Sequence, residues 1–412
     1  MIDAERPRRR SRAGAGTIKL VDPTTLLLRL LRPHSPGDHL APGLRWIGVS
    51  SDVGLRLRVE LGGAPMWVDV QPLASVERYA ARSRHFAYAY RTEGDRRPLD
   101  GAKGKALCQR IAAIAATNEV AVIEALEAEV EASAPPPRVR HVSVSQALEP
   151  AGDSLHPHYT LSPYVGCTIG CGYCYAHRQL QPLRRLLRLA PAPWGSYLDI
   201  RDNLPEVLAE ELRRLKPLPI KLCPIVSDPY QASEARERLT RRTLEVLAAA
   251  EAVWPTLLLT RSTLILDDLE LLQRHPRIAA GVSLPTVDDS VRRHFEPRAA
   301  SVDERLDLLA RLKRAGVRTH AVVQPILPGP IDKLADALAR ATDSVTIDVL
   351  RGEGEASGVF DAAEVEGCRT RGWQLERALE LRAGLERRGV AIWRGELPPY
   401  LTVAGLRASG AR

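Results

Sequence analysis

The chain has few methionines and phenylalanines, 2 and 3 among 412 residues, and it has no long apolar run. A bilayer-spanning helix needs roughly 18 consecutive apolar residues. The N-terminus is basic, but no apolar stretch follows it as a secretory signal requires. We therefore expect a cytoplasmic protein without membrane association. Hydrophobic residues still make up 45% of the chain, which is typical of a globular protein.

Cysteine is also scarce, with six in the chain, and its spacing does not resemble a disulfide framework. Three cysteines gather within eight residues, and these are Cys167, Cys171 and Cys174. The other three are scattered, and these are Cys108, Cys223 and Cys368. The clustered set therefore predicts metal chemistry rather than structural cross-links.

The net charge of +8 has two interpretations. One is an arginine-rich composition that also favours alanine and leucine. The other is a polyanionic partner such as a nucleic acid. The sequence has no basic and aromatic stripe of the kind that binds single strands, so the compositional interpretation is favoured.

Changes in composition and pattern divide the chain into five parts. Residues 1–16 form a basic tail, and 17–133 an N-terminal α+β domain of unknown role. Residues 134–154, which begin with a run of prolines, are predicted to be a linker. Residues 155–350 alternate short strands with helices, and 351–412 add a loop, a helix and a strand.

The N-terminal domain shows a β-hairpin signal. Residues 54–61 and 66–70 alternate apolar and polar side chains around Gly62 and Gly63. Residues 86–90 alternate in the same way, and 104–133 have helical periodicity. We find no catalytic set of residues in this part.

Six strand-and-helix units follow, with strands predicted near residues 158, 220–226, 256–260, 278–283, 318–326 and 345–350. This rhythm predicts an α/β fold in which a parallel sheet curls into a partial (β/α)6 barrel. In such barrels the chemistry lies at the carboxyl ends of the strands. The cysteine loop follows the first strand and so lies at that end.

The cysteine loop has the spacing C-x3-C-x2-C and three interleaved glycines that let the backbone fold around a metal centre. One interpretation is a zinc site, with His177 as the fourth ligand. The other is a [4Fe–4S] cluster held by three thiolates, which leaves the fourth iron open to a small molecule.

At these residues the chain resembles the radical S-adenosylmethionine (radical SAM) superfamily, and in particular its spore photoproduct lyase-related branch. The resemblance covers roughly residues 155–350. It is carried by the following segments: Ser162-Pro-Tyr-x-Gly-Cys-x-x-Gly-Cys-x-Tyr-Cys-Tyr175, Ser227-Asp-Pro-Tyr-Gln231, Leu239-Thr-Arg241, Leu259-Thr-Arg261, Glu296-Pro-Arg298 and Pro325-Ile-Leu-Pro-Gly-Pro330.

The resemblance implies that the three clustered cysteines ligate a [4Fe–4S] cluster and that S-adenosylmethionine chelates the open iron. Reductive cleavage of S-adenosylmethionine would give a 5′-deoxyadenosyl radical, which abstracts a hydrogen atom from substrate. The electron would come from an external one-electron reductant of flavodoxin or ferredoxin type. Such an enzyme is expected to be sensitive to oxygen.

The resemblance also implies contacts to S-adenosylmethionine. Tyr173 would lie beside the adenine, and Ser227 and Asp228 would meet the methionyl amino group or the ribose. Arg261 would pair with the methionyl carboxylate. Ser283, at the end of the fourth strand, is another candidate contact. Ordinary capping of strand ends is the alternative for each residue.

The substrate stays open between a small molecule, a peptide and a nucleic acid. Spore photoproduct lyase uses a cysteine near the end of its second strand as a hydrogen donor, and the corresponding position here is Ile225. Cys223 lies two residues earlier, so it is a candidate catalytic residue with a core cysteine as the alternative. A nucleic-acid lesion lyase and a zinc-stabilised nucleic-acid-binding module remain the alternative functions.

Overall fold

The computed structural model describes most of the chain. The described residues are 20–51, 55–73, 79–92, 101–132, 138–153, 155–187, 189–222, 225–351, 357–362 and 365–408. They include every predicted metal and S-adenosylmethionine residue. Cys223 and the predicted tail, residues 1–16, lie outside them.

The N-terminal part contains a six-stranded antiparallel sheet with the order β2-β3-β4-β5-β7-β6. Its strands are β2 (His39–Ala41), β3 (Leu44–Ser50), β4 (Arg56–Leu61), β5 (Ala64–Pro72), β6 (Ala81–Arg82) and β7 (Phe86–Thr92). The predicted hairpin is confirmed, because β4 pairs with β5 across Gly62 and Gly63. Both glycines have positive φ values, 59° and 85°, which this tight turn requires.

Helices α1 (Pro23–Leu30) and α2 (Ala102–Ala132) pack against each other, and α2 also packs on β7. By length and composition α2 could cross a membrane, since the window Ala102–Leu126 has a mean hydropathy of 1.3. However, one face of this helix, including Leu107, Ile111 and Leu126, is buried in the N-terminal core. This face of the helix therefore packs in the core, while 39% of the window as a whole is buried.

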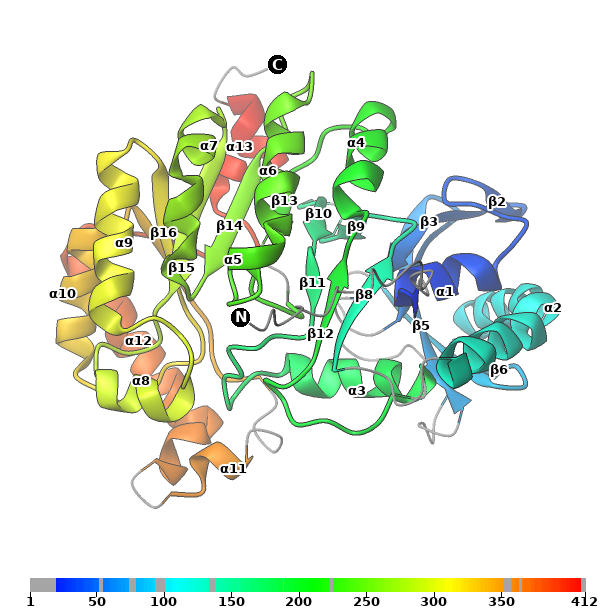
Figure 1. The fold of residues 1–412 in the computed structure, drawn as a ribbon, viewed down its shortest axis with the longest axis horizontal. Coiled ribbons are helices and arrows are strands. Elements are labelled where there is room, and N and C mark those ends of the chain that lie inside the picture. The colour runs from blue at the N-terminus through cyan, green and yellow to red at the C-terminus, as the bar shows by residue number, and fades with distance from the viewer. Residues whose placement is uncertain are drawn as a thin grey trace, which may run out of the picture.

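The second sheet has eight strands in the order β18-β17-β16-β15-β14-β13-β10-β9 (Figure 1). The strands are β9 (Leu148–Ala151), β10 (His158–Leu161), β13 (Ile220–Leu222), β14 (Thr256–Thr260), β15 (Ile278–Ser283), β16 (Arg318–Val323), β17 (Ser344–Ile347) and β18 (Ala391–Trp393). All neighbours from β10 to β18 pair in parallel, and β9 pairs antiparallel at the edge. The predicted α/β fold with a partial barrel is confirmed.

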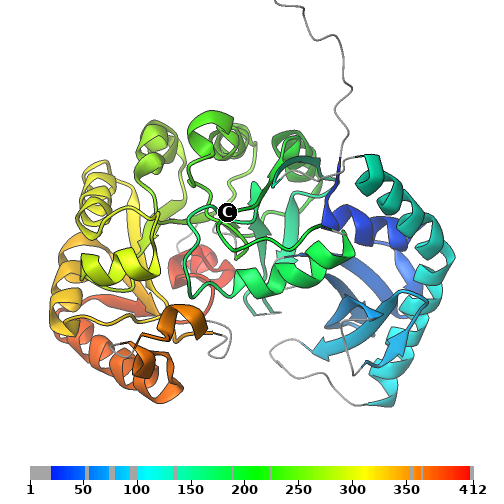
Figure 2. The ribbon, with the colours of Figure 1, turned by 60° about the horizontal axis from the view of Figure 1, so that its bottom comes forward.

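Helices cover the outer face of this curved sheet, as Figures 1 and 2 show. They are α4 (Leu204–Arg214), α6 (Leu239–Ala249), α7 (Leu269–Arg274), α9 (Val302–Arg314), α10 (Ile331–Ala341) and α12 (Arg371–Arg387). The main core lies between these helices and the sheet. Helix α9 begins at a capping box in which Ser301 and Glu304 each accept a hydrogen bond from the other's backbone N–H.

The predicted linker, residues 134–154, is not simply a linker, because it contains β9 and β8 (Val139–Ser143). Strand β8 belongs to a third sheet, β1-β8-β12-β11, with β1 (Leu20–Val21), β11 (Tyr164–Val165) and β12 (Leu198–Arg201). Arg140 of β8 is buried and donates from Nε to Asp199 Oδ1 of β12 at 2.7 Å. This pairing with a distant segment could not be read from local pattern.

The predicted C-terminal extension also differs from its expected place. Strand β18 joins the barrel sheet beside β17, which gives the sheet a seventh parallel strand. Trp393 of β18 packs with Leu257, Leu397 and Leu401 inside the barrel. The C-terminal segment therefore contributes apolar side chains to the barrel interior.

Candidate active site

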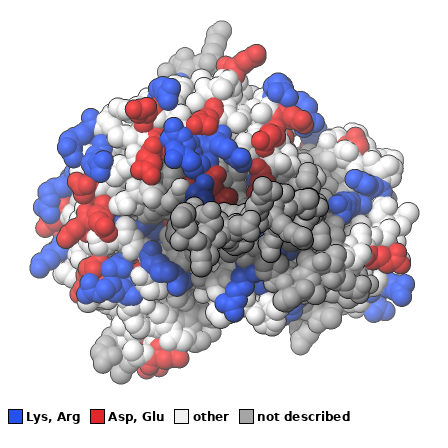
Figure 3. Space-filling view, in the orientation of Figure 1, with Lys and Arg blue, Asp and Glu red and all other residues white. Residues whose placement is uncertain are grey.

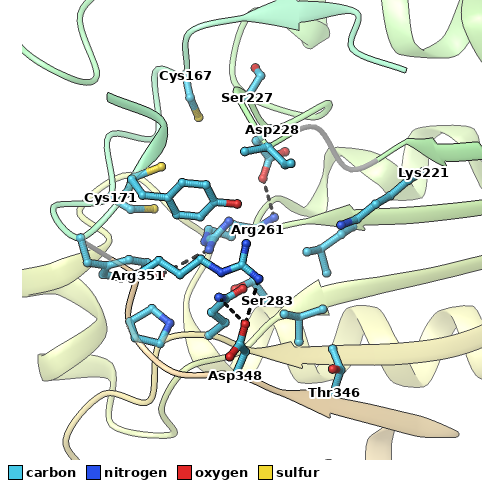
Figure 4. Close-up of a pocket in the computed structure, with 18 of the residues that line it drawn as sticks. Cys167, Cys171, Lys221, Ser227, Asp228, Arg261, Ser283, Thr346, Asp348 and Arg351 are labelled. Carbon is cyan, nitrogen blue, oxygen red and sulfur yellow. Dashed lines mark hydrogen bonds and ion pairs between the residues drawn. The ribbon is translucent and has the colours of Figure 1, made fainter. Parts of the chain in front are cut away.

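One cavity contains the cysteine loop together with every described candidate cofactor residue. It lies at the carboxyl ends of the barrel strands and has an empty volume of about 1180 Å³, part of it open to solvent. The predicted residues that line it are Cys167, Cys171, Cys174, Tyr173, Ser227, Asp228, Arg261 and Ser283. Figure 4 shows Cys167, Asp228 and Arg261 around a shared space.

Cysteines ligate metals as thiolates, so the three thiols must lose their protons before they can act as ligands. Burial raises the pKa of Cys167 to about 12 and raises the pKa of Cys171 and Cys174 as well. Metal binding would therefore release protons from these thiols. Among the residues that the structure describes, no three His, Cys, Asp or Glu side chains form a group that could hold a single metal ion.

The chemistry of the donor set fits an iron–sulfur cluster, since three cysteines on one tight loop face one cavity. Close packing also fixes the loop. A Cβ on Gly172 would lie 2.7 Å from the Val359 side chain, and one on Gly170 would meet Arg298 at 2.3 Å. His177 has other partners, because its ring packs on Trp194 and its Nδ1 lies 3.3 Å from the Gln181 amide. The His177 ring therefore already has two side-chain neighbours.

Ser227 and Gln231 brace the backbone on both sides of Cys167. Gln231 Oε1 accepts from the Thr168 N–H at 2.8 Å and from its hydroxyl at 3.0 Å. Gln231 Nε2 donates to Ser227 Oγ at 2.8 Å, and Ser227 donates to the Gly166 carbonyl at 2.7 Å. Ser227 therefore supports the cysteine loop while also lining the cavity.

Asp228 joins the ends of two neighbouring strands. Its Oδ1 accepts from Thr260 Oγ1 at 2.7 Å and from the Tyr230 N–H at 2.9 Å. Its Oδ2 accepts from the Arg261 N–H at 2.8 Å. Burial raises the pKa of Asp228, although these donors oppose the shift. The carboxylate is thus held rigidly at the cavity wall.

Glu296 is the buried centre of a network behind Tyr173 and Arg261. Its Oε1 accepts from Arg261 Nε at 2.9 Å and from the Tyr173 hydroxyl, and its Oε2 accepts from Arg305 Nη2 at 2.5 Å. Burial opposes ionisation, but the guanidinium groups of Arg305 and Arg261 hold the pKa of Glu296 below its usual value. The two predicted cofactor contacts are therefore oriented by a carboxylate to which the sequence analysis assigned no role.

Ser283 and His320 bring unpartnered polar atoms to the cavity. Within the described part of the chain, Ser283 Oγ and both ring nitrogens of His320 are buried without a hydrogen-bond partner. Gly281 lies opposite His320 on the neighbouring strand, and a Cβ there would lie 2.7 Å from His320 Nδ1. Burial lowers the pKa of His320 to about 3, so the ring is neutral near pH 7. These groups suit a polar ligand.

Charged side chains from distant segments also line the cavity. Lys221 of β13 forms an ion pair with Glu396, which follows β18. Arg351 Nη2 and Gln324 Nε2 both donate to Asp348 Oδ2 at 3.0 Å, and Figure 4 shows Arg351 reaching toward Asp348. Sequence reasoning missed these side chains and the role of His320. The glycine at position 281 inside a strand was the one local signal.

The predicted catalytic candidate Cys223 lies outside the described residues. Ile225, two residues further along the chain, lines the cavity.

Comparisons with known proteins point to one family. The family model described as Radical SAM superfamily matches residues 161–349. An uncharacterised protein of Methanocaldococcus jannaschii is 28% identical over 174 residues, which cover 42% of this chain and 62% of that protein. An uncharacterised protein of Mycobacterium tuberculosis (strain H37Rv) is 30% identical over 228 residues, which cover 51% of this chain and 64% of that protein. The matched regions thus span less than two thirds of these relatives.

A radical SAM Nalpha-GlyT isomerase of Pseudomonas phage M6 is 27% identical over 168 residues, which cover 40% of this chain and 33% of that protein. Among solved structures, spore photoproduct lyase complexed with dinucleoside spore photoproduct is 19% identical. That match has a TM-score of 0.44 and covers 61% of this chain and 81% of the lyase.

Proposed function

We propose that this chain, a radical SAM superfamily enzyme by the match over residues 161–349, binds a [4Fe–4S] cluster and S-adenosylmethionine in the cysteine-lined cavity. Cys167, Cys171 and Cys174 would hold the cluster. When bound, this pair would supply reductive cleavage of S-adenosylmethionine and abstraction of a hydrogen atom from a substrate.

The observation that carries the proposal is the composition of one cavity. Three cysteines of one loop, two of them buried, share it with the buried Asp228 carboxylate and the Arg261 guanidinium. Ser283 and His320 add polar atoms that have no hydrogen-bond partner among the described residues. Such a mixture provides metal ligands and polar contacts for a charged cofactor in the same space.

The chain's own residues would bind, orient and shield. Ser227 and Gln231 keep the cysteine loop in one conformation, which favours ligation because less order is lost on binding. Asp228 and Arg261 offer opposite charges that match an amino group and a carboxylate. Ile225, Leu257 and Leu259 line the same cavity and would limit the access of water.

The proposal includes two further parts. The electron would come from an external carrier of flavodoxin or ferredoxin type, and the enzyme would work in the cytoplasm, protected from oxygen.

Anaerobic reconstitution with iron and sulfide tests the proposal. We expect about four irons per chain and absorption near about 400 nm in the wild type and in Cys108→Ala, whose thiol is buried in the N-terminal core. Cys171→Ala should lose the absorption. With dithionite and S-adenosylmethionine, the wild type should form 5′-deoxyadenosine. Stoichiometric zinc without sulfide would contradict the proposal.

A further inference from the structure

A second cavity lies beside the first, between the N-terminal sheet and α3 (Ala176–Leu186). One wall comes from β4, β5 and β7, and the opposite wall comes from α3. Figures 1 and 2 show α3 lying between the N-terminal sheet and the barrel. The second cavity has an empty volume of about 1700 Å³, part of it open to solvent.

The two cavities are adjacent, because Tyr175 and Arg351 line both of them. The Arg351 guanidinium lies 5.7 Å from the centre of the Tyr175 ring and bonds Asp348 in the first cavity. Arg351 Nε is buried without a partner among the described residues. A ligand that passes Tyr175 and Arg351 would therefore reach from one cavity into the other.

Positive charge dominates the described lining of the second cavity. The arginines that line it are Arg56, Arg91, Arg178, Arg185 and Arg351, and the acidic residue is Asp69. Arg351 pairs with Asp348, so the other four arginines against Asp69 leave a formal net charge of +3 on the described lining. By contrast, basic and acidic side chains are interspersed over the described part of the face in Figure 3.

The N-terminal wall holds two of these guanidinium groups in fixed positions. The buried Asp69 carboxylate accepts from Arg56 Nε at 2.7 Å and from Arg91 Nε at 2.6 Å. Asp69 therefore holds both guanidinium groups at the cavity wall. Because Asp69 is buried, the pairs are screened less than surface ion pairs.

The opposite wall presents two exposed arginines at helical spacing. Arg178 and Arg185 lie seven residues apart on α3, which is about two turns and places them on the same face. Between them in the sequence, Gln179 brings to the lining a buried Oε1 that has no hydrogen-bond partner in the described part of the chain. Both walls therefore turn polar and mostly cationic groups toward the same space.

We propose that this arginine-lined cavity is the outer half of the substrate site and binds a phosphate-bearing part of the substrate. The inference rests on the proposed function, because the reacting group would enter the barrel cavity while the phosphate stays outside it. Planar guanidinium groups match phosphate oxygens with paired donors, so clustered arginines favour phosphate. The phosphate belongs either to a small phosphate ester or to a nucleic-acid strand.

The proposal also gives the N-terminal sheet a function, namely to supply one wall of this anion site. In the first cavity, Lys221 pairs with Glu396 and Arg351 pairs with Asp348. These cations already have carboxylate partners, so they do not require an anionic ligand. A substrate with an uncharged reacting group and an anionic remainder fits both cavities.

Binding of two probes to the anaerobically reconstituted full chain tests the proposal. The probes are inorganic pyrophosphate, followed by calorimetry, and a fluorescein-labelled single strand of about eight nucleotides, followed by anisotropy. The variant is Arg178→Gln with Arg185→Gln. The matched control is Arg213→Gln with Arg214→Gln, which makes the same charge change on the exposed end of α4.

We expect the wild type to bind at least one probe, and the α3 variant to bind it at least about tenfold more weakly. The control variant should stay within about twofold of the wild type. Arginine-dependent binding of pyrophosphate alone would identify a small phosphate ester, and binding of the oligonucleotide alone would identify a nucleic acid. Competition between the probes would support one shared phosphate site.

The proposal is overturned if the wild type binds neither probe, or if both double variants weaken binding equally. Thermal melting checks that the variants fold. If the α3 double variant does not fold, Arg178→Gln and Arg185→Gln are measured separately. The binding assay contains no reductant. Failure of the proposed function would be seen separately, as missing iron or missing 5′-deoxyadenosine in the wild type.

Discussion

Glu296 lies in one of the short segments that carry the family resemblance, and it shows what such a segment contributes at the scale of single residues. The sequence predicted Tyr173 and Arg261 as direct contacts to a cofactor, and both line the cavity. The structure adds that both bond the same buried carboxylate. A side chain that bonds distant residues has no local sequence pattern, so its role could not be predicted.

The hydrogen bonds that Gln231 makes to Thr168 and Ser227 can be tested by mutation. Replacing it with alanine would leave the Thr168 N–H without its acceptor and Ser227 without one donor. Because such unsatisfied groups cost about 1–3 kcal/mol each, Gln231→Ala should loosen the cysteine loop. We expect less iron per chain after reconstitution, measured by colorimetric assay.

The matched control is Gln273→Ala, since the exposed Gln273 donates only to the Ala315 carbonyl among the described residues. It should retain the iron content of the wild type. Equal iron in both variants would show that the brace does not govern cluster loading.

The buried, neutral His320 should make the folded state less stable at acidic pH. Burial lowers its pKa from 6.5 to about 3, so the unfolded chain binds this proton more readily than the folded chain. The stability that depends on neutral His320 is therefore present above pH 6.5 and is lost as pH falls toward 3. The free energy of unfolding should drop by about 2 kcal/mol between about pH 7 and 5 from this residue.

His320→Gln should remove this part of the pH dependence, as measured by urea unfolding at several pH values. Burial also lowers the pKa of His158 and His275 to about 4, so the variant should keep part of the acid sensitivity. A variant with the same slope as the wild type would contradict the assignment to His320.

At the scale of elements, the Glu211 carboxylate connects α4 to the start of β9 through hydrogen bonds. Glu211 of α4 accepts from the N–H groups of Ala147 and Leu148 at 3.2 and 2.7 Å. Burial raises the pKa of Glu211 from 4.5 to about 7, although these N–H donors oppose the shift. The folded chain therefore favours the protonated side chain.

Because the folded pKa is raised, this contribution to stability is present below pH 4.5 and is lost as pH rises through 7. Glu211→Gln cannot ionise and should not lose it. Relative to the wild type, the variant should gain about 3 kcal/mol between about pH 4.5 and 8. Denaturant titrations at both pH values measure the difference, and a pH-independent difference would refute the prediction.

Strand β18 shows what element prediction can and cannot reach. The sequence predicted a strand within residues 351–412, and the structure has it at Ala391–Trp393. Its place beside β17 depends on packing of Trp393 with Leu257 inside the barrel, and thus on residues far apart in the chain. The same placement brings Glu396 to Lys221.

At the scale of the whole molecule, the N-terminal part and the barrel part share a core. Leu180 and Leu183 of α3, which follows the cysteine loop, pack with the N-terminal residues of that core. Strand β1 also pairs with β8, which pairs with β12. The two parts should therefore unfold together.

Leu180→Ala tests this coupling. Truncating a buried leucine costs about 2–5 kcal/mol, so the melting temperature of the whole chain should fall in a single calorimetric transition. Leu379→Ala on α12 is the control, because Leu379 is 66% exposed and should change stability little. Two transitions, with only one shifted by Leu180→Ala, would show that the parts unfold independently.

The sequence by itself determined the alternation of strands and helices, the position of the cysteine loop after the first barrel strand and the family resemblance. These features depend on local periodicity and on short motifs, which each segment carries alone. Only the tertiary structure decided that β8 and β9 pair with distant strands and that β18 belongs to the barrel sheet. It also decided that Glu296, His320 and Lys221 lie in or beside the site. It also placed the arginines of β4, β7 and α3 around one cavity, because such assemblies form only when distant segments pack together.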